Sequence, residues 1–231
     1  MNESSVSHKS HHYIIGKRLN KNDAMKIRDV QQEIQNKNEF LEPQDKINNI
    51  YSPFLYLGYF NENIENKLKL LVLPELFAIA EKFGPMRCPL SNYSLTGQSK
   101  RYKYLGLTYK SPENYLEDII IPYLKSYMDK YTNSNLTYEN IPMIPLYRLN
   151  HKKKDEFFKT NPSTKSNGKT VFTDIKFPSI GYNSKLKSKY IDIDSLDLLR
   201  ATPITVKKGK KSFNEALHID SVLSIPLAGE L

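Results

Sequence analysis

The hexapeptide FLYLGY, from Phe54 to Tyr59, is matched later in the chain by FPSIGY, from Phe177 to Tyr182. Both have the form Phe, any residue, a hydroxyl side chain, an aliphatic residue, Gly and Tyr. Phe, Tyr, Leu and Ile are common in strands, so the repeat can arise by chance in two buried strands. The alternative is that the two hexapeptides are corresponding strands in two halves of one fold.

The composition predicts a globular, basic protein. The chain has 231 residues, 39% of them apolar, which is enough for the core of one large domain or of two small ones. No apolar run approaches the roughly 20 residues that span a bilayer, and we expect neither a membrane span nor a signal peptide. The single cysteine, Cys88, predicts a small core residue and a reducing, intracellular compartment, in the nucleus or the cytoplasm.

The chain divides by composition near residue 48. Residues 1–48 are polar and predict an N-terminal arm with one helix, capped by Asn22 or Asp23, that packs on the body or on a partner. Residues 49–231 predict one domain with two intertwined lobes, roughly 51–135 and 136–231.

Within this domain, strand-like and helical patterns are mixed without strict alternation. Pro74 is expected to interrupt the first helix, and Ser111 to cap a second helix that Pro122 kinks. Strands are expected at 52–60, 88–97, 101–109, 141–149 (an edge strand, because of its prolines), 171–183, 190–204 and 216–229. Residues 150–170 predict a polar loop, and the whole pattern predicts an α+β fold.

This order of elements resembles the two-histidine phosphoesterase superfamily, which includes LigT-like and AKAP7-like proteins. The resemblance covers about residues 51–229 and implies a two-lobed, pseudo-twofold sandwich of antiparallel sheets with outer helices around a central cleft. In that family each lobe contributes one strand that carries His, any residue, Thr or Ser, and an apolar residue. Phe54 and Tyr56 occupy these positions in the first hexapeptide, and Phe177 and Ser179 occupy them in the second.

The resemblance also implies a chemistry, and the two phenylalanines remove it. In active members one His accepts a proton, the other donates one, and the hydroxyl residues hold the phosphate. Phe54 and Phe177 have no ionisable atom, so neither can act as an acid or a base. Tyr56 is expected to fill space meant for phosphate, while Ser179 keeps the family type. The sequence thus predicts a pseudoenzyme with no catalytic residue.

Other polar groups have mostly structural interpretations. His151 is expected in a solvated loop, and His218 beside Asp220 on one strand face, although either histidine could serve an atypical phosphodiesterase. The alternation of YIDID predicts Asp192 and Asp194 on the solvent side. No framework of metal ligands is present, and we expect no metal and no cofactor.

Two lysine clusters are candidate nucleic-acid contacts. They consist of Lys152, Lys153 and Lys154 and of Lys207, Lys208, Lys210 and Lys211, and both are predicted in loops. Such loops can follow a phosphate backbone while aromatic residues stack on bases. The net charge of +9 agrees with a polyanionic partner, but the clusters would look the same as solvated turns.

Three functions stay open at this point. The first is a non-catalytic binding or scaffold subunit, in an RNA-containing or other multiprotein assembly, that contacts protein partners through the N-terminal arm. The second is an atypical RNA or cyclic-nucleotide phosphodiesterase. The third is an adaptor that binds only proteins.

Overall fold

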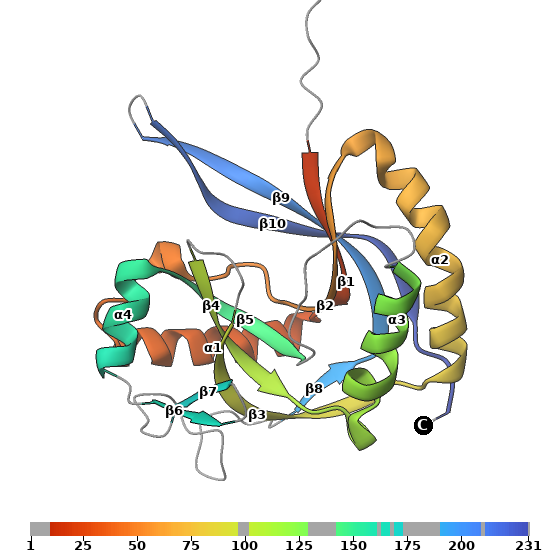
Figure 1. Cartoon of the computed structure of the whole chain (residues 1–231), viewed down its shortest axis with the longest axis horizontal. Coiled ribbons are helices and arrows are strands. Elements are labelled where there is room, and N and C mark those ends of the chain that lie inside the picture. Colours follow the sequence, from red (N-terminus) through yellow and green to blue (C-terminus); the bar gives the residue numbers. More distant parts are fainter. Residues whose placement is uncertain are drawn as a thin grey trace, which may run out of the picture.

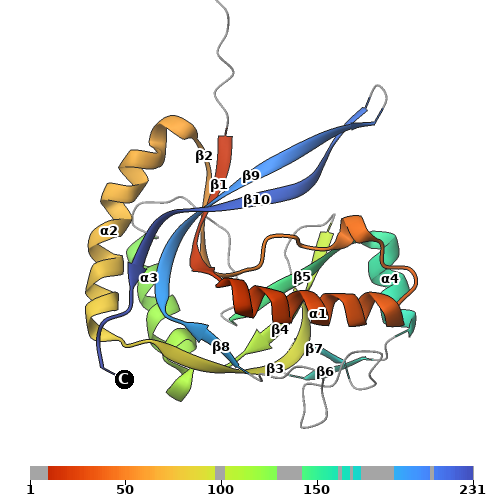
Figure 2. The same cartoon turned by 180° about the vertical axis from the view of Figure 1, so that it is seen from behind.

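The computed structural model describes residues 10–96, 102–128, 142–160, 163–166, 169–172, 190–208 and 211–230. These residues form two antiparallel sheets with helices packed outside them (Figures 1 and 2). The mixture of antiparallel sheets and a few helices confirms the predicted α+β, two-lobed sandwich.

The four-stranded sheet A has the order β10-β9-β1-β2. Its strands are β1 (Ser10–Arg18), β2 (Tyr51–Asn61), β9 (Ser195–Lys208) and β10 (Lys211–Pro226). Sheet B has the order β5-β4-β3-β7-β6, and β8 also pairs with β3. Its strands are β3 (Met86–Thr96), β4 (Tyr102–Tyr109), β5 (Met143–Asn150), β6 (Ser163–Ser166), β7 (Lys169–Phe172) and β8 (Tyr190–Ile193). The place of β5 at the end of this order confirms the predicted edge strand.

Strand β1 corrects the prediction of a separate N-terminal arm. It lies inside sheet A, with β2 on one side and β9 on the other. Tyr13 and Ile15 are fully buried in the main hydrophobic core. The arm prediction was wrong for residues 10–48, because pairing on both sides satisfies the backbone of a strand that looks polar in the sequence.

Helix α1 (Lys21–Lys37) confirms the predicted helix and its docking on the body. Its buried stripe contains Ile27, Val30 and Ile34. Asn20, rather than Asn22 or Asp23, is the N-cap, and its side-chain oxygen accepts a hydrogen bond from the Asp23 N–H at 2.9 Å. The interpretation as an arm failed although the helix itself was correct.

Helix α2 (Glu65–Lys82) runs through Pro74 without interruption, contrary to the prediction. Proline in a helix interior costs about 3 kcal/mol relative to alanine. The helix nevertheless buries Leu68, Val72 and Leu76 along one side, and this burial of apolar surface offsets the cost.

The helical segment after Ser111 is irregular near Pro122, which agrees with the predicted kink. A π-helical turn (Tyr115–Ile120) leads into α3 (Ile121–Met128), and Pro122 lies just after the junction. The Ser111 hydroxyl accepts a hydrogen bond from the Leu116 N–H at 2.8 Å. The π turn shifts the hydrogen-bond ladder where Pro122 has no donor.

Helix α4 (His151–Thr160) replaces the first half of the loop predicted at 150–170. Asn150 begins it, since its side-chain oxygen accepts a hydrogen bond from the Lys153 N–H at 3.0 Å. Phe157 is fully buried and packs edge-on against Phe40, with ring centroids 6.0 Å apart. This buried ring holds the polar helix on the body, and β6 and β7 occupy much of the remainder of the predicted loop.

Candidate functional site on the inner face of sheet A

Two irregularities in β2 decide which side chains of FLYLGY reach each face of sheet A. Tyr13 pairs with Gly58 and Ile14 with Tyr56, so Leu57 has no counterpart on β1. Ile15 pairs with Leu55 and Gly16 with Pro53, so Phe54 has none either. Such an unpaired residue is a β-bulge, and it interrupts the alternation of side chains between the two faces.

Phe54 belongs to the main hydrophobic core and is 2% exposed, whereas Tyr56 packs with a separate, smaller cluster. The family motif places its two positions on one face, and Phe54 and Tyr56 do not share one. A functional group at Phe54 would therefore point into the core rather than toward a ligand beside Tyr56. Phe177 and Ser179, the positions in the second hexapeptide, lie outside the described residues.

We call the face of sheet A that carries Tyr56 its inner face. Residues that pair directly on neighbouring strands share a face, so the pairs identify its other members. His12 pairs with Tyr59 and Ala201, and Ile14 pairs with Tyr56 and Leu199. A buried cluster covers much of this face and consists of Ile14, Tyr51, Leu199, Ala201 and Ile219, with Ile47 and Tyr56 packed against it. This face is therefore largely apolar and aromatic.

His12 is the imidazole on this inner face. Its Nδ1 is hydrogen-bonded to the Tyr56 hydroxyl, and its ring centroid lies 4.7 Å from that of Tyr59. Burial, together with the neighbouring His11, lowers the pKa of His12. The imidazole is therefore neutral at pH 7, with apolar and aromatic neighbours.

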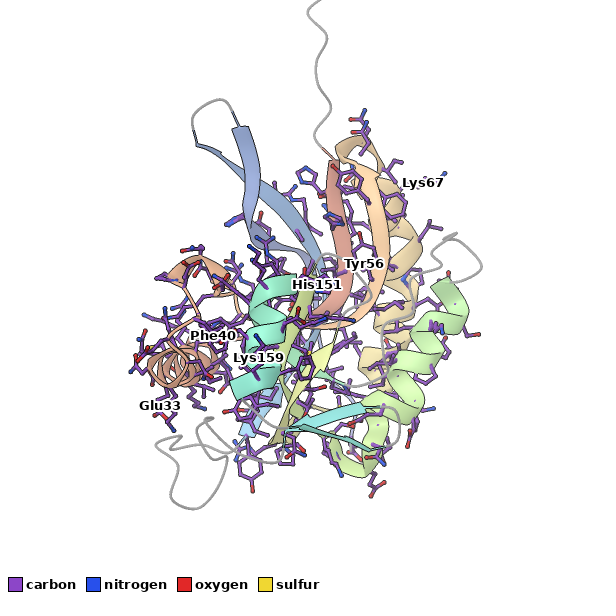
Figure 3. All side chains as sticks on the ribbon, turned by 60° about the vertical axis from the view of Figure 1, so that its left-hand side comes forward. Glu33, Phe40, Tyr56, Lys67, His151 and Lys159 are labelled. Atoms are coloured by element: carbon purple, nitrogen blue, oxygen red, sulfur yellow. The ribbon has the colours of Figure 1, made fainter. Side chains whose placement is uncertain are left out.

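Tyr56 also lies near Tyr104 on β4 of sheet B. Burial raises its pKa to about 12, and Tyr104 on β4 and Tyr59 on β2 add to this effect. The phenol is thus a permanent hydrogen-bond donor at neutral pH. Figure 3 shows Tyr56 on sheet A, with His151 in the first turn of α4. Tyr56 was a candidate from the sequence, whereas His12 was not, because its only signal was the strand-like YII that follows it.

A charged network lies on the other side of sheet A, at the first turn of α2. Arg200 contacts Glu65 at 3.2 Å and Asp220 at 3.5 Å, and the Tyr13 hydroxyl donates to Glu65 at 2.9 Å. His218 Nε2 lies 3.0 Å from a carboxylate oxygen of Asp220, which confirms the prediction that the two side chains share one strand face. His218 is thereby part of a structural network on the face opposite His12.

Two other histidines of the described ranges, His11 and His151, also have polar partners. His11 is buried and shares a 2.9 Å hydrogen bond through Nδ1 with the Thr202 hydroxyl. His151 lies 3.7 Å from Asp155 on the exposed surface of α4, so it is in a helix and not in the predicted loop.

The acidic strand behaves as predicted. Ile191 and Ile193 are buried, while Asp192 and Asp194 point outward and pair with Arg87 and Lys17. Cys88 is a buried free thiol, and burial raises its pKa to about 12. Within the described ranges no three His, Cys, Asp or Glu side chains are arranged to hold a metal, and no helix is long and apolar enough to cross a membrane.

The three lysines of the first cluster all lie in α4, where their side chains have different surroundings. Lys152 is exposed, whereas Lys153 forms ion pairs with Glu42 and, at 2.5 Å, with Asp45. Although burial lowers the pKa of Lys153, the hydrogen bonds that its ammonium group donates to Asp45 and Glu42 raise it overall. Lys153 therefore ties α4 to the turn before β2, and Lys154 pairs with Asp155.

We expect Lys153→Ala to lower the free energy of unfolding by about 2 kcal/mol, because it leaves the buried Asp45 carboxylate without its cation. Lys152→Ala is the matched control and should change it by less than about 0.5 kcal/mol. Urea denaturation of both variants measures this difference. Equal effects of the two substitutions would contradict the structural role of Lys153.

Three lysines of the second cluster lie at the adjoining ends of β9 and β10, which form a long hairpin. Lys207 and Lys208 end β9, Lys211 begins β10, and Lys208 pairs with Lys211. Lys210 lies outside the described residues. Strand β1 pairs with β9 only over residues 197–201, so the hairpin continues beyond the sheet as a two-stranded ribbon (Figures 1 and 2).

Comparison with known proteins identifies the fold. No family model matches the sequence, and no curated protein matches it. Among solved structures, apo LigT of E. coli has a TM-score of 0.54 at 14% identity and covers 94% of this chain and 98% of its own. A structure described as a phosphoesterase has a TM-score of 0.52 at 12% identity, with the same coverage. LigT complexed with ATP has a TM-score of 0.52 at 13% identity, covering 95% and 98%. The chain therefore has the two-lobed α+β fold of LigT and of these phosphoesterase structures.

Proposed function

We propose that this chain is a non-catalytic, RNA-binding subunit with a phosphoesterase-like fold, and that its basic hairpin contacts the phosphate backbone. The observation that carries the proposal is the β9–β10 ribbon, which extends beyond the edge of the sheet and contains Lys207, Lys208 and Lys211. Protein partners in the same assembly are compatible with it.

The distribution of histidines supports the absence of catalysis. General acid–base cleavage of a phosphodiester in this fold uses one imidazole from each lobe, facing each other. Strand β2 contains no histidine. The segment 152–217, which includes Phe177 and Ser179, contains none either. Of the described histidines, only His12 lies on the inner face of sheet A, and the apolar cluster around Ile14 occupies much of that face.

The hairpin supports RNA as the ligand. A ribbon that projects beyond its sheet can approach a phosphate backbone, and each contact between a lysine and a phosphate releases counterions. Tyr59 is exposed beside His12 on the inner face and offers a ring on which an unpaired base can stack. We therefore expect a preference for single-stranded RNA over a duplex.

Charge reversal of the hairpin tests this function. A variant with Lys207, Lys208, Lys210 and Lys211 all changed to Glu should bind a short single-stranded RNA at least about 100-fold more weakly in low salt. The control changes Lys21, Lys37, Lys110 and Lys159, exposed lysines elsewhere, to Glu and alters the net charge equally. Fluorescence anisotropy at several salt concentrations measures both. The hairpin variant should also lose most of the salt dependence.

Equal losses of RNA affinity in the two variants would show that only the net charge matters, and would contradict a binding site on the hairpin. Unchanged binding in the hairpin variant would exclude the hairpin as the RNA contact. A stable protein complex that survives nuclease treatment and ignores both variants would favour the protein-only adaptor.

A second candidate function rests on the neutral His12 hydrogen-bonded to the Tyr56 hydroxyl, because Nδ1 could take the phenol proton while the phenol oxygen takes a proton from an attacking group. It predicts turnover of 2′,3′-cyclic nucleotides or short RNAs that His12→Gln abolishes. Such turnover would overturn the non-catalytic proposal, whereas wild-type protein that is as inactive as His12→Gln agrees with it.

A further inference from the structure

The solvent-facing side of helix α2 carries an apolar stripe. Between Lys67 and Glu81 the exposed residues of this helix are all uncharged: Leu70, Pro74, Phe77 and Ala78. Leu70 is 73% exposed and Phe77 is 48% exposed. At about 100° per residue, Lys67, Leu70, Pro74, Phe77 and Glu81 fall along one line of the helix surface. We call these five residues the α2 stripe.

The packing of α2 leaves the stripe open. The opposite side of the helix buries Leu68, Val72, Leu76 and Ile79. Figures 1 and 2 show α2 at the lateral edge of the molecule in both views, with its outer side away from the sheets. An exposed apolar line with charges only at its two ends is typical of an interaction site rather than of a solvated helix face.

The charges at the ends of the stripe indicate which partner fits it. Lys67 and Glu81 are equally far from Pro74 along the chain, on opposite sides, and both are exposed. Neither takes part in an ion pair among the described residues. A surface with one positive end, an apolar middle and one negative end is complementary to itself when it is turned by 180°.

We propose that a second copy of this chain docks on the α2 stripe, antiparallel, with the twofold axis near Pro74. Lys67 of each copy then faces Glu81 of the other, and Leu70 of each packs beside Phe77 of the other. A parallel arrangement would place like charges against each other at both ends, so the charges select the antiparallel one. Close approach at the axis is possible because Pro74 is compact and has no polar side chain. This inference is independent of the proposed RNA binding.

The size of the stripe sets the expected strength. A pair of helices that contact along about four turns buries less surface than most permanent dimers. We therefore expect a reversible, concentration-dependent dimer with a dissociation constant on the order of 10 µM.

Sedimentation equilibrium of the full chain over a range of concentrations tests the dimer. The wild type should fit a monomer–dimer equilibrium, and Leu70→Asp combined with Phe77→Asp should weaken it at least about 100-fold. Met25→Asp is the control, since Met25 is 53% exposed on α1 and lies outside the stripe. It should leave the equilibrium unchanged.

Charge exchange tests the geometry without placing a charge in the apolar middle. Lys67→Glu alone and Glu81→Lys alone should each weaken the dimer about tenfold, because each creates two like-charged pairs. An equimolar mixture of the two single variants should dimerise as well as the wild type, since both pairs are opposite again in the mixed dimer. The double variant Lys67→Glu with Glu81→Lys should also recover.

Several results would overturn the proposal. The first is a wild-type protein that stays monomeric at concentrations well above the expected dissociation constant. The second is a dimer that the Leu70→Asp, Phe77→Asp variant still forms. The third is a mixture of the two charge variants that dimerises no more strongly than either variant alone. Circular dichroism and thermal unfolding establish that each variant is folded. Should the aspartate variant fail to fold, the charge-exchange set still decides the question.

Discussion

Replacing Ile15 with Ala should lower the free energy of unfolding by about 3 kcal/mol. Ile15 is fully buried in β1, between Leu55 of β2 and Leu198 of β9. Truncation removes apolar contacts from the middle of sheet A and leaves a cavity that paired strands on both sides cannot readily close. Urea denaturation with a global fit of the slope measures the loss.

Met25→Ala is the matched control, because it truncates an exposed apolar side chain in the same N-terminal segment. It should change the stability by less than about 0.5 kcal/mol. If Ile15→Ala were as neutral as Met25→Ala, the N-terminal segment would be an arm after all, and the central position of β1 would be incorrect.

Gly16→Ala should also destabilise the protein, by about 2 to 3 kcal/mol. A methyl group added at Gly16 would lie 2.3 Å from the carbonyl oxygen of Ser52 and 3.1 Å from the Cα of Pro53. Both contacts are with backbone, so no side chain can rotate away. The close approach results from the bulge at Phe54, where β2 bends across β1.

The sign of this effect makes the test decisive. In an ordinary strand, replacing Gly with Ala stabilises by roughly 0.5 to 1 kcal/mol, because it reduces the freedom of the unfolded chain. Ile14→Val, a neighbouring change that removes one methylene from the inner face, should cost only about 1 kcal/mol. A stabilised Gly16→Ala variant would show that the strands are further apart and that β2 has no bulge there.

The two halves of the proposed function depend on different parts of the molecule. RNA binding depends on the hairpin tip, and the loss of catalysis depends on the inner face of sheet A. The α2 stripe lies on neither of them, since α2 contacts the outer side of sheet A through Glu65. A dimer formed through α2 would therefore leave both inner faces and both hairpins accessible, which permits two RNA contacts in one particle.

Local sequence patterns predicted much of the fold. The alternation of Ile191 and Ile193 with Asp192 and Asp194 was sufficient to orient β8, because a half-buried strand must separate apolar from polar side chains. The prolines of β5 indicated an edge, since they cannot donate to a ladder on both sides. The strand order and the two hexapeptides were sufficient for the fold itself, and the similarity to LigT confirms it.

The prediction of the site was less complete, and each failure has a physical cause. His12 was assigned to a polar tail because its strand, β1, has few apolar residues. A strand that pairs on both sides needs little hydrophobicity of its own, and one of its two neighbours, β9, comes from the far end of the chain. Helix α4 was assigned to a loop because its attachment depends on Phe157 and on the pairing of Lys153 with Asp45, which lies more than 100 residues away in the sequence.

The sequence by itself determined the α+β class, the positions of most strands and the basic charge, because these follow from residue identity and short-range periodicity. Only the tertiary structure decided that β1 is central, that bulges turn Phe54 into the core while Tyr56 faces His12, and that α2 presents an open stripe. Each of these depends on register or packing between distant segments, which no local pattern records.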